Sequence, residues 1–450
     1  MTPDQPKKSV FIQTYGCQMN TYDSEKLLEQ LRAIDFVSTE DPDNADLILV
    51  NTCAIRENAE NKVFSLLGSL NVIKERRPDV VIGVGGCVAQ QQGAEILRRS
   101  KQVDMVFGTD NLFDLPEMLE EVARGARPVR TEFRHQKQKI ANFVPSFDLD
   151  ANQTNPIKGS IAITKGCNNF CTFCVVPYTR GREVSREPEN IIEEARRMVA
   201  QGVLEITLLG QNVNSYTAGE VSFVTLLEQL NNIQGLERIR YISPHPKDLK
   251  VELAKAHRDL PKLCEHMHLP FQAGSDQILK TMRRNHTMAE YFEKIDMLRE
   301  YRPDIALSTD IIVGFPGETE ADFEQTLEAM RRARFDHIYA FKFSPRTDTP
   351  ATAFEGQLDE NVKADRLARL WELHEKINAE IQAGLVGSRQ EVLVEGPHPK
   401  DAGAVIGRTR NNRSTTLVNG NHETGALVPV KIVAARKFSL VGKEALHEPR

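Results

Sequence analysis

Long apolar runs are missing from this sequence. Hydrophobic residues make up 40% of its 450 residues, yet no stretch approaches the ~18–20 uninterrupted apolar residues that a membrane-spanning helix requires. The first residues, MTPDQPKKS, also have no apolar core of the kind found in secretory signal peptides. We therefore expect a cytoplasmic protein that is not associated with a membrane.

An excess of positive charge is missing as well, and cysteines are few. A formal net charge of −6 argues against a generally basic nucleic-acid binder, so any contact with RNA would have to come from a local patch. In a reducing compartment, seven cysteines indicate metal binding or catalysis rather than disulfides. The positions of these cysteines are therefore the main functional signal.

The length predicts two or three domains, because single cores stop growing near ~250–300 residues. In the first of these, residues 8–125, a unit of apolar strand, cysteine and helix occurs three times. The strands are expected at Val10–Tyr15, Asp46–Val50 and Val80–Val84, and the cysteines that follow them are Cys17, Cys53 and Cys87. Successive βα units form parallel strands whose carboxyl ends share one sheet edge. The three thiols should therefore meet in space and hold a metal cluster.

A basic linker is expected over residues 126–156, where the regular pattern fails. The charges in and just before its first part are Arg124, Arg127, Arg130, Arg134, Lys137 and Lys139, against one acid, Glu132. A solvated charge run and a contact with RNA explain this composition equally well.

Residues 157–386 alternate strands with helices and predict a parallel sheet curved into a partial (βα)6 barrel. The expected strands are Ile161–Thr164, Glu205–Leu209, Arg238–Ser243, His266–Phe271, Ala306–Val313 and His337–Phe343. Helical patterns lie between them, as at Pro188–Ala200 and Ala321–Ala333, and a long polar helix runs from Asp359 to about Leu385. Such a barrel has its active site at the carboxyl ends of the strands.

The tail, residues 387–446, predicts a small all-β barrel. Its short β-rich runs are Gln390–Val394, Ala404–Thr409, Thr415–Val418 and Leu427–Ala434, and glycine, proline and asparagine separate them. Residues 388–450 hold 10 Lys and Arg against 6 Asp and Glu in an otherwise acidic chain. The tail is therefore the better RNA-binding candidate.

The sharpest motif is a group of three cysteines, Cys167, Cys171 and Cys174, directly after the first strand of the second domain. Three thiolates on one short loop can hold three irons of a 4Fe-4S cube and leave the fourth iron without a protein ligand. A zinc site would need a fourth ligand, but no histidine occurs between His135 and His245. We expect Cys264, which has no partner, to be a packing residue.

This cysteine spacing resembles the signature of the radical S-adenosylmethionine (SAM) superfamily. The resemblance implies that SAM chelates the open iron and is cleaved to a 5′-deoxyadenosyl radical. Segments after later strands resemble the superfamily's SAM-binding turns, and the residues we expect to contact SAM are Gly210, Gln211, Asn212, Asp310 and Gly314. Pro270–Ser275 ends the fourth strand in a similar position. Ordinary βα turns remain the alternative for each segment.

From about Lys8 to Glu444 the chain resembles the radical SAM methylthiotransferases, which have an N-terminal three-cysteine domain, a radical SAM core and an RNA-binding barrel called TRAM. Three runs resemble the branch that modifies isopentenylated adenosine in transfer RNA: Thr14–Asn20, Cys171–Glu183 and Gly210–Tyr216. Sister branches act on threonylcarbamoyl-adenosine of tRNA or on an aspartate of a ribosomal protein, and they stay alternatives.

The resemblance implies a reaction with two SAM molecules and two [4Fe-4S] clusters. One SAM methylates a sulfur at an auxiliary cluster held by Cys17, Cys53 and Cys87. The other, at the cluster held by Cys167, Cys171 and Cys174, yields the radical that takes hydrogen from carbon 2 of N(6)-isopentenyladenosine at tRNA position 37. No catalytic residue beyond the cluster ligands is implied.

The resemblance also implies an electron donor such as a flavodoxin or ferredoxin, and we expect a monomer. From a different class, a non-catalytic iron-sulfur sensor that binds RNA would share the cysteines. Such a sensor would release no 5′-deoxyadenosine.

Overall fold

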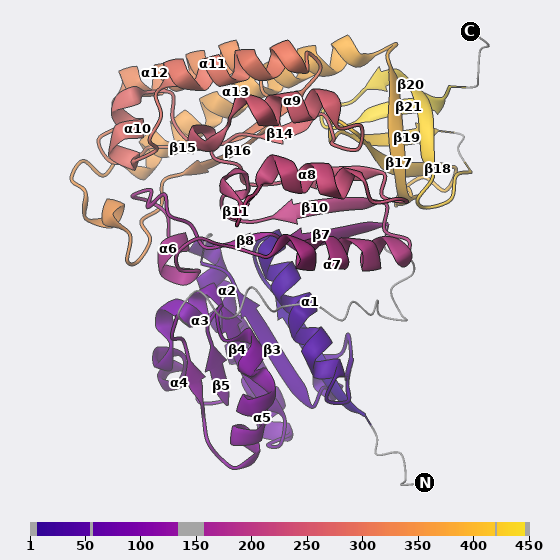
Figure 1. Ribbon diagram of the computed structural model, residues 1–450. Coiled ribbons are helices and arrows are strands. Elements are labelled where there is room, and N and C mark those ends of the chain that lie inside the picture. Colours follow the sequence, from indigo (N-terminus) through magenta and orange to yellow (C-terminus); the bar gives the residue numbers. More distant parts are fainter. Residues whose placement is uncertain (1–6, 55–56, 134–156, 419–420, 446–450) are drawn as a thin grey trace.

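The computed structural model describes residues 7–54, 57–133, 157–418 and 421–445. Figure 1 shows an N-terminal domain against one side of a central core, and a small yellow barrel at another. Among the described residues, no helix is long and apolar enough to cross a membrane. Arg134, Lys137 and Lys139 of the predicted basic linker lie outside the described residues.

The N-terminal domain is built on a six-stranded, wholly parallel sheet in the order β2-β1-β3-β4-β5-β6. Its strands are β1 (Lys8–Thr14), β2 (Phe36–Ser38), β3 (Leu47–Thr52), β4 (Val81–Gly86), β5 (Met105–Phe107) and β6 (Val129–Arg130). The three strands predicted from the sequence are β1, β3 and β4, and they are neighbours. Strand β6 extends this sheet beyond residue 125, and the domain boundaries at 125, 156 and 386 stay predictions.

Alternating side chains cover the two faces of this sheet, as a strand's period of two requires. Leu47 and Leu49 of β3 pack with one set of helical residues, whereas Ile48 and Val50 pack with another on the opposite face. Both faces of the sheet are therefore buried, which is typical of a doubly wound α/β domain. The helices are α1 (Gln18–Arg32), α2 (Glu57–Arg76), α3 (Cys87–Gln92), α4 (Ala94–Arg99) and α5 (Leu115–Ala123).

The strand order places a topological switch point between β1 and β3. The chain leaves β1 toward β2 on one side and leaves β3 toward β4 on the other. Open α/β sheets bind their ligands in the crevice that opens at this point, outside the carboxyl ends of the strands. Cys17 follows β1 and Cys53 follows β3, so two cysteines lie at the two sides of this crevice.

The core consists of two parallel three-stranded sheets, β7-β10-β13 and β14-β15-β16, which a bridge between Ile239 and Leu263 joins. This confirms the partial barrel and its six strands. The strands are β7 (Lys158–Ala162), β10 (Glu205–Leu209), β13 (Arg238–Tyr241), β14 (His266–His268), β15 (Ala306–Val313) and β16 (His337–Lys342). Short antiparallel pairs flank them: β8 (Thr164–Lys165) with β9 (Val184–Ser185), and β11 (Thr217–Ala218) with β12 (Val221–Ser222).

Helices cover the outer face of the core sheets. They are α6 (Val176–Thr179), α7 (Pro188–Ala200), α8 (Phe223–Asn231), α9 (Val251–Asp259), α10 (Asp276–Met282), α11 (Met288–Tyr301), α12 (Glu320–Ala333) and α13 (Glu360–Leu385). The predicted helix at Pro188–Ala200 is confirmed, as is the long helix with Asp359 as its N-cap. Helix α12 begins one residue before its predicted start, because Thr319 and Asp322 form a capping box there.

The tail is a closed five-stranded barrel in the order β17-β18-β19-β21-β20, as Figure 1 shows in yellow. Its strands are β17 (Arg389–Pro397), β18 (Ala404–Thr409), β19 (Ser414–Val418), β20 (Leu427–Ala435) and β21 (Leu440–Glu444). The sequence predicted the first four. Strand β21 was missed, although it closes the barrel by pairing with both β19 and β20.

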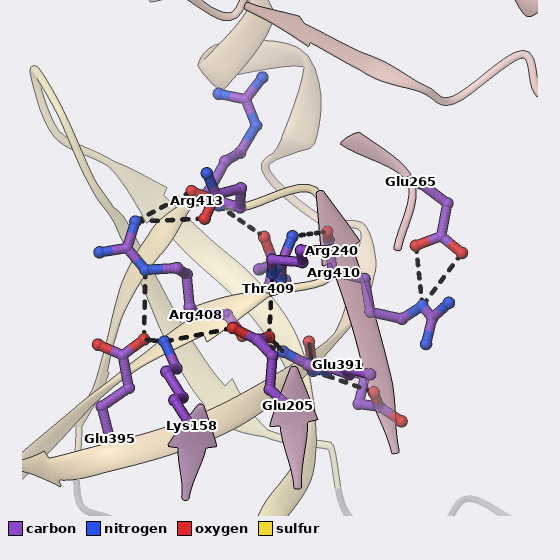
Figure 2. Close-up of polar contacts among 12 residues, drawn as sticks. Lys158, Glu205, Arg240, Glu265, Glu391, Glu395, Arg408, Thr409, Arg410 and Arg413 are labelled. Carbon is purple, nitrogen blue, oxygen red and sulfur yellow. Dashed lines mark hydrogen bonds and ion pairs between the residues drawn. The ribbon is translucent and has the colours of Figure 1, made fainter. Parts of the chain in front are cut away.

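Buried arginines attach this barrel to the amino ends of the core strands. Arg238 Nη1 donates to the carbonyl of Arg408 at 2.8 Å, and Arg240 donates to the carbonyls of Arg410 and Thr409 at 2.8 and 2.9 Å. Glu205 accepts from Arg240 Nε at 3.0 Å. Figure 2 shows Arg240 between the Glu205 strand and the turn that carries Thr409 and Arg410.

Ion pairs of residues in and beside this turn correct the prediction that the basic residues of the tail face RNA. Arg410 pairs with Glu265 at 2.8 Å, Arg408 with Glu395 at 3.2 Å, and Arg413 with Asp336. Three of the tail's cations therefore take part in internal ion pairs, two of them to the core, and other residues must provide any RNA-binding surface.

Replacing Arg240 by Met should loosen the small barrel from the core. The change leaves Glu205 buried without its nearest cation, and removing one partner of a buried pair costs about 3–5 kcal/mol. We expect faster amide hydrogen exchange at residues 404–418 and a lower unfolding temperature. The control is Lys400→Met, because Lys400 is an exposed cation of the same barrel that forms no ion pair within the described structure. Unchanged exchange in Arg240→Met would contradict this attachment.

Candidate active site

The first cysteine group lies at the carboxyl edge of the N-terminal sheet. Cys17 is the N-cap of α1, Cys53 follows β3, and Cys87 is the first residue of α3. Gly16 adopts φ +118°, and a Cβ there would come within 2.3 Å of Cys53 Cβ. Only glycine lets the Cys17 and Cys53 segments approach so closely.

Thr52 ties the third cysteine to the other two. Its hydroxyl donates to the Gly85 carbonyl at 2.6 Å and accepts from the backbone N–H of Val88 at 3.1 Å. This side chain therefore fixes the start of α3, where Cys87 stands, against the end of β3. The three cysteines thus follow three neighbouring strands at one edge of the sheet, and their joint role as cluster ligands stays a prediction.

The environment of Cys17 favours a thiolate. The pKa of Cys17 is lowered to about 6, mainly by a hydrogen bond with Cys53 and also by the positive charge of Arg180. Burial of the thiol acts in the opposite direction. The thiolate is the form of cysteine that binds metals. The first group is therefore electrostatically suited to hold an iron-sulfur cluster.

The second cysteine group lies on the loop between β8 and α6. Gly166, with φ +76°, packs so tightly that a Cβ would come within 2.2 Å of the Arg182 carbonyl oxygen. Phe170, between the first two cysteines, has a left-handed φ of 48°, and the Arg182 guanidinium lies 4.3 Å from its ring centroid. Backbone strain of this kind concentrates at functional sites.

Donors surround the sulfurs of this loop. The Asn169 side chain donates to Cys167 Sγ at 3.4 Å, and Arg284 Nη1 donates to Cys171 Sγ at 3.4 Å. Burial raises the pKa of Cys174 to about 12, and the neighbouring Cys171 adds to this shift. Hydrogen bonds to sulfur and burial are the factors that set the potential of an iron-sulfur cluster.

The donor set of both groups suits clusters better than single ions. Within the described part of the chain, no three His, Cys, Asp or Glu side chains are close enough together to hold one metal ion. Three thiols that each bind a different iron do not need to be so close.

Two of the expected SAM contacts lie beside the second cysteine group. Gln211 Oε1 accepts from the Gly166 N–H at 2.6 Å and so holds the base of the cysteine loop. Asn212 Nδ2 donates to Asp248 at 2.8 Å, whereas its buried Oδ1 has no hydrogen-bond partner within the described structure. A free buried acceptor fits a polar ligand at this place. Gly210 supports the turn, because a Cβ there would come within 2.1 Å of Thr164 Oγ1.

The other expected SAM contacts have different surroundings. Asp310 lies on β15, 3.4 Å from His268 Nε2. The Gly314 N–H donates to Glu318 at 2.6 Å, and Lys363 of α13 fills the space where a side chain of residue 314 would be. The described hydrogen bonds of Gly314 therefore do not link it to the cysteine loop.

The inner face of the β14-β15-β16 sheet was not predicted. His268, Asp310, Tyr339 and Phe341 share the face opposite to the helix-covered one, because Asp310 pairs in register with Tyr339. Tyr339 and Phe341 are 45% and 46% exposed. Exposed aromatic rings beside polar groups suit a stacked nucleobase.

The contact between the two domains was also missed by sequence reasoning. Met19 and Tyr22 of α1 pack against Leu209 at the end of β10, with Cys17, Ala162 and Ile242 alongside. The first cysteine group therefore faces the carboxyl ends of the core strands, where the second group lies. Buried ion pairs reinforce this contact: Arg180 with Asp23 at 2.7 Å and Lys26 with Glu194 at 3.0 Å. In the sequence, the only signal for these residues was the family resemblance of the two segments that contain Cys17 and Arg180.

Cys264 occupies a packing position, as expected. It is 1% exposed, and its backbone N–H donates to the Ile239 carbonyl at 3.0 Å. Burial raises the pKa of its thiol.

These pKa shifts predict the reactivity of the iron-free protein. At pH 7.5 a thiol with a pKa of about 6 is mostly thiolate, so Cys17 should react with iodoacetamide faster than Cys174 or Cys264. Lowering the pH through 6 should slow Cys17 by protonating it. Mass-spectrometric mapping of alkylated peptides measures these rates. A Cys17 rate that keeps rising up to about pH 8.5, as for an ordinary thiol, would contradict the assigned environment.

Family comparisons cover most of the chain. Residues 9–108 match "Uncharacterized protein family UPF0004", residues 161–330 match the radical SAM superfamily, and residues 384–443 match the TRAM domain. Among solved structures, the radical SAM methyltransferase TsrM from Kitasatospora setae, with tryptophan and a SAM analogue bound, has a TM-score of 0.60 over 81% of this chain and 89% of that one. At 13% identity this likeness shows the fold alone.

Curated relatives match the chain from end to end. The tRNA-2-methylthio-N(6)-dimethylallyladenosine synthase of Clostridium beijerinckii is 46% identical over 97% of this chain and 96% of its own length. The synthase of the same name from Moorella thermoacetica is 44% identical over 97% and 98%. The chain therefore belongs to the family of the tRNA-2-methylthio-N(6)-dimethylallyladenosine synthases, which joins a radical SAM core to a TRAM domain.

Proposed function

We propose that this chain transfers a methylthio group to carbon 2 of N(6)-isopentenyladenosine at position 37 of transfer RNA. The observation that carries the proposal is the placement of two separate groups of three cysteines. Each group lies at the carboxyl edge of a parallel sheet, and the two edges face each other across a buried domain contact. The synthases that share this chain's family carry that substrate in their names.

The cysteine groups have separate roles in this proposal. Cys167, Cys171 and Cys174 hold the cluster that binds SAM, and Cys17, Cys53 and Cys87 hold the auxiliary cluster. When bound, the two [4Fe-4S] clusters and SAM supply the electron, the 5′-deoxyadenosyl radical and the methylthio group.

Protein side chains orient the reactants and keep water out. Gln211 holds the base of the cysteine loop through the Gly166 N–H, and the free Oδ1 of Asn212 offers an acceptor to the polar end of SAM. Met19 and Tyr22 close the space between the two cysteine groups with apolar surface. Exclusion of water protects a reactive radical from side reactions.

The substrate base has a candidate position on the inner face of the core. RNA bases that enzymes modify leave their stack and are held by aromatic side chains. Tyr339 and Phe341 supply exposed rings there, and the His268 and Asp310 side chains supply polar contacts.

A row of three cations on the small barrel is the RNA surface that we favour. Arg389 on β17 pairs in register with Lys431 on β20, which pairs in register with Lys443 on β21. All three are exposed. Exposed cations on neighbouring strands of the barrel suit contacts with the phosphates of an RNA backbone.

Three further elements of the proposal concern the setting of the reaction. An electron donor such as a flavodoxin or ferredoxin reduces the core cluster. The protein acts as a monomer, and it works in the cytoplasm.

Separate replacement of the two cysteine groups tests the two-cluster assignment. Changing Cys167, Cys171 and Cys174 to Ala should abolish reductive SAM cleavage, because no iron would remain to chelate SAM. Changing Cys17, Cys53 and Cys87 to Ala should leave about half of the iron and normal 5′-deoxyadenosine release, but no methylthiolated tRNA. Iron, 5′-deoxyadenosine and methylthio nucleoside are quantified in parallel.

Cys264→Ala is the matched control, because Cys264 is a buried thiol outside both groups and should keep full iron and turnover. Wild-type iron content in the Cys17, Cys53 and Cys87 variant would refute the auxiliary cluster.

Changing Arg389, Lys431 and Lys443 to Ala should weaken tRNA binding and lower the slope of log K against log salt by about 2–3, since each phosphate contact contributes ~0.7–0.9. SAM cleavage without tRNA should be unchanged. A control with the same change in net charge replaces Arg98, Lys101 and Lys376, which are exposed on other elements. Equal salt slopes in both triple variants would show that RNA binds elsewhere.

A further inference from the structure

Arg180 connects the two cysteine groups. It follows helix α6, in the segment that leaves the core's cysteine loop after Cys174, and it is 5% exposed. Helix α6 lies against α3, which begins with Cys87 of the N-terminal domain. A fully ionised guanidinium in such a buried position needs specific partners.

Those partners belong to the N-terminal domain. Arg180 Nη2 donates to Asn20 Oδ1 at 3.0 Å and to Asp23 Oδ2 at 2.7 Å. The backbone N–H of Asn20 donates to the Cys17 carbonyl at 2.9 Å. Asn20 Nδ2 donates to the Thr52 carbonyl at 2.7 Å, directly before Cys53. Arg180 of the core thus contacts Asn20, and Asn20 binds both the Cys17 segment and the Cys53 segment.

The charge of Arg180 reaches the thiols as well as the carboxylate. Burial lowers the pKa of Arg180, but the negative charges of Asp23, Cys87 and Cys17 raise it by more, so that the net shift is upward. Asp23 is its one ion-pair partner within the described structure, and the guanidinium is therefore an electrostatic partner of whatever anion the thiols hold.

We propose that Arg180 is a positioning residue that holds the auxiliary cluster's ligand segments against the core and sets the reduction potential of that cluster. The inference rests on the proposed function, because it requires the cluster at Cys17, Cys53 and Cys87. A buried positive charge near a cluster favours the more negative, reduced state. The charge of Arg180 therefore raises the reduction potential of the nearby auxiliary cluster more than that of the core cluster.

The interface contains a matched control residue. Arg186 is 2% exposed, pairs with Glu194 of its own domain, and donates to the Tyr22 hydroxyl across the same domain contact at 3.3 Å. None of its described hydrogen bonds reaches a cysteine or Asn20. Loss of Arg186 should therefore loosen the interface without a direct electrostatic effect on the clusters.

The test is a redox titration of both clusters, followed by electron paramagnetic resonance, in the full-length reconstituted protein. Arg180→Met should lower the midpoint potential of the auxiliary cluster and leave that of the core cluster unchanged, and Arg180→Lys should restore much of the shift. Asp23→Asn removes the opposing charge and should raise the auxiliary potential. Arg186→Met should change neither potential.

Unchanged auxiliary potentials in Arg180→Met and Asp23→Asn would overturn the inference, as would equal shifts of both clusters. If Arg180→Met does not assemble the auxiliary cluster, Asp23→Asn decides, because it must raise the auxiliary potential while Arg180→Lys keeps that potential near the wild-type value. The proposed function is tested separately, because it fails if the wild-type protein shows no second cluster. A second cluster that is present, but whose potential does not change in the variants, contradicts only the role of Arg180.

Discussion

The packing of α1 against the carboxyl ends of β7, β10 and β13 is the contact on which the arrangement of the site depends. Met19, Tyr22 and Leu209 form its apolar centre, and the Arg180–Asp23 pair seals it. Because both sheets are parallel, each presents its strand ends at one edge, and ligands collect there. This packing brings the two sheet edges, and with them the two groups of cysteines, to the same domain contact.

The opposite end of the core is occupied by the small barrel. Arg238 and Arg240 extend from β13 to the carbonyls of Arg408, Thr409 and Arg410, so the small barrel covers this end of the core sheets. Figure 2 shows Arg240 in this contact. The core sheets end at β7 and β16, which do not pair with each other within the described structure.

Much of this structure could be predicted from the sequence. The six core strands, three of the N-terminal strands and the long helix follow from period and length, and the cysteines follow from their equivalent places after strands. Strands β2, β5 and β6 were missed because two or three residues carry no readable alternation. Strand β21 was missed because Val441-Gly442-Lys443 interrupts the apolar pattern, although pairing with two neighbours stabilises it.

Contacts between distant segments could not be predicted. Nothing in composition says that Arg410 and Arg413 bind the core while Lys431 and Lys443 face outward, since this depends on which side of the barrel is docked. Likewise, nothing in the sequence indicates that Arg180 forms hydrogen bonds with Asn20 and Asp23, because only the folded structure brings these residues together.

The central claim is that two clusters lie face to face across one domain contact. Anomalous diffraction at the iron edge, from anaerobically reconstituted crystals, tests it most directly. We expect two separate iron peaks, one bounded by Cys17, Cys53 and Cys87 and the other by Cys167, Cys171 and Cys174. A single iron peak, or a peak at Cys264, would contradict it.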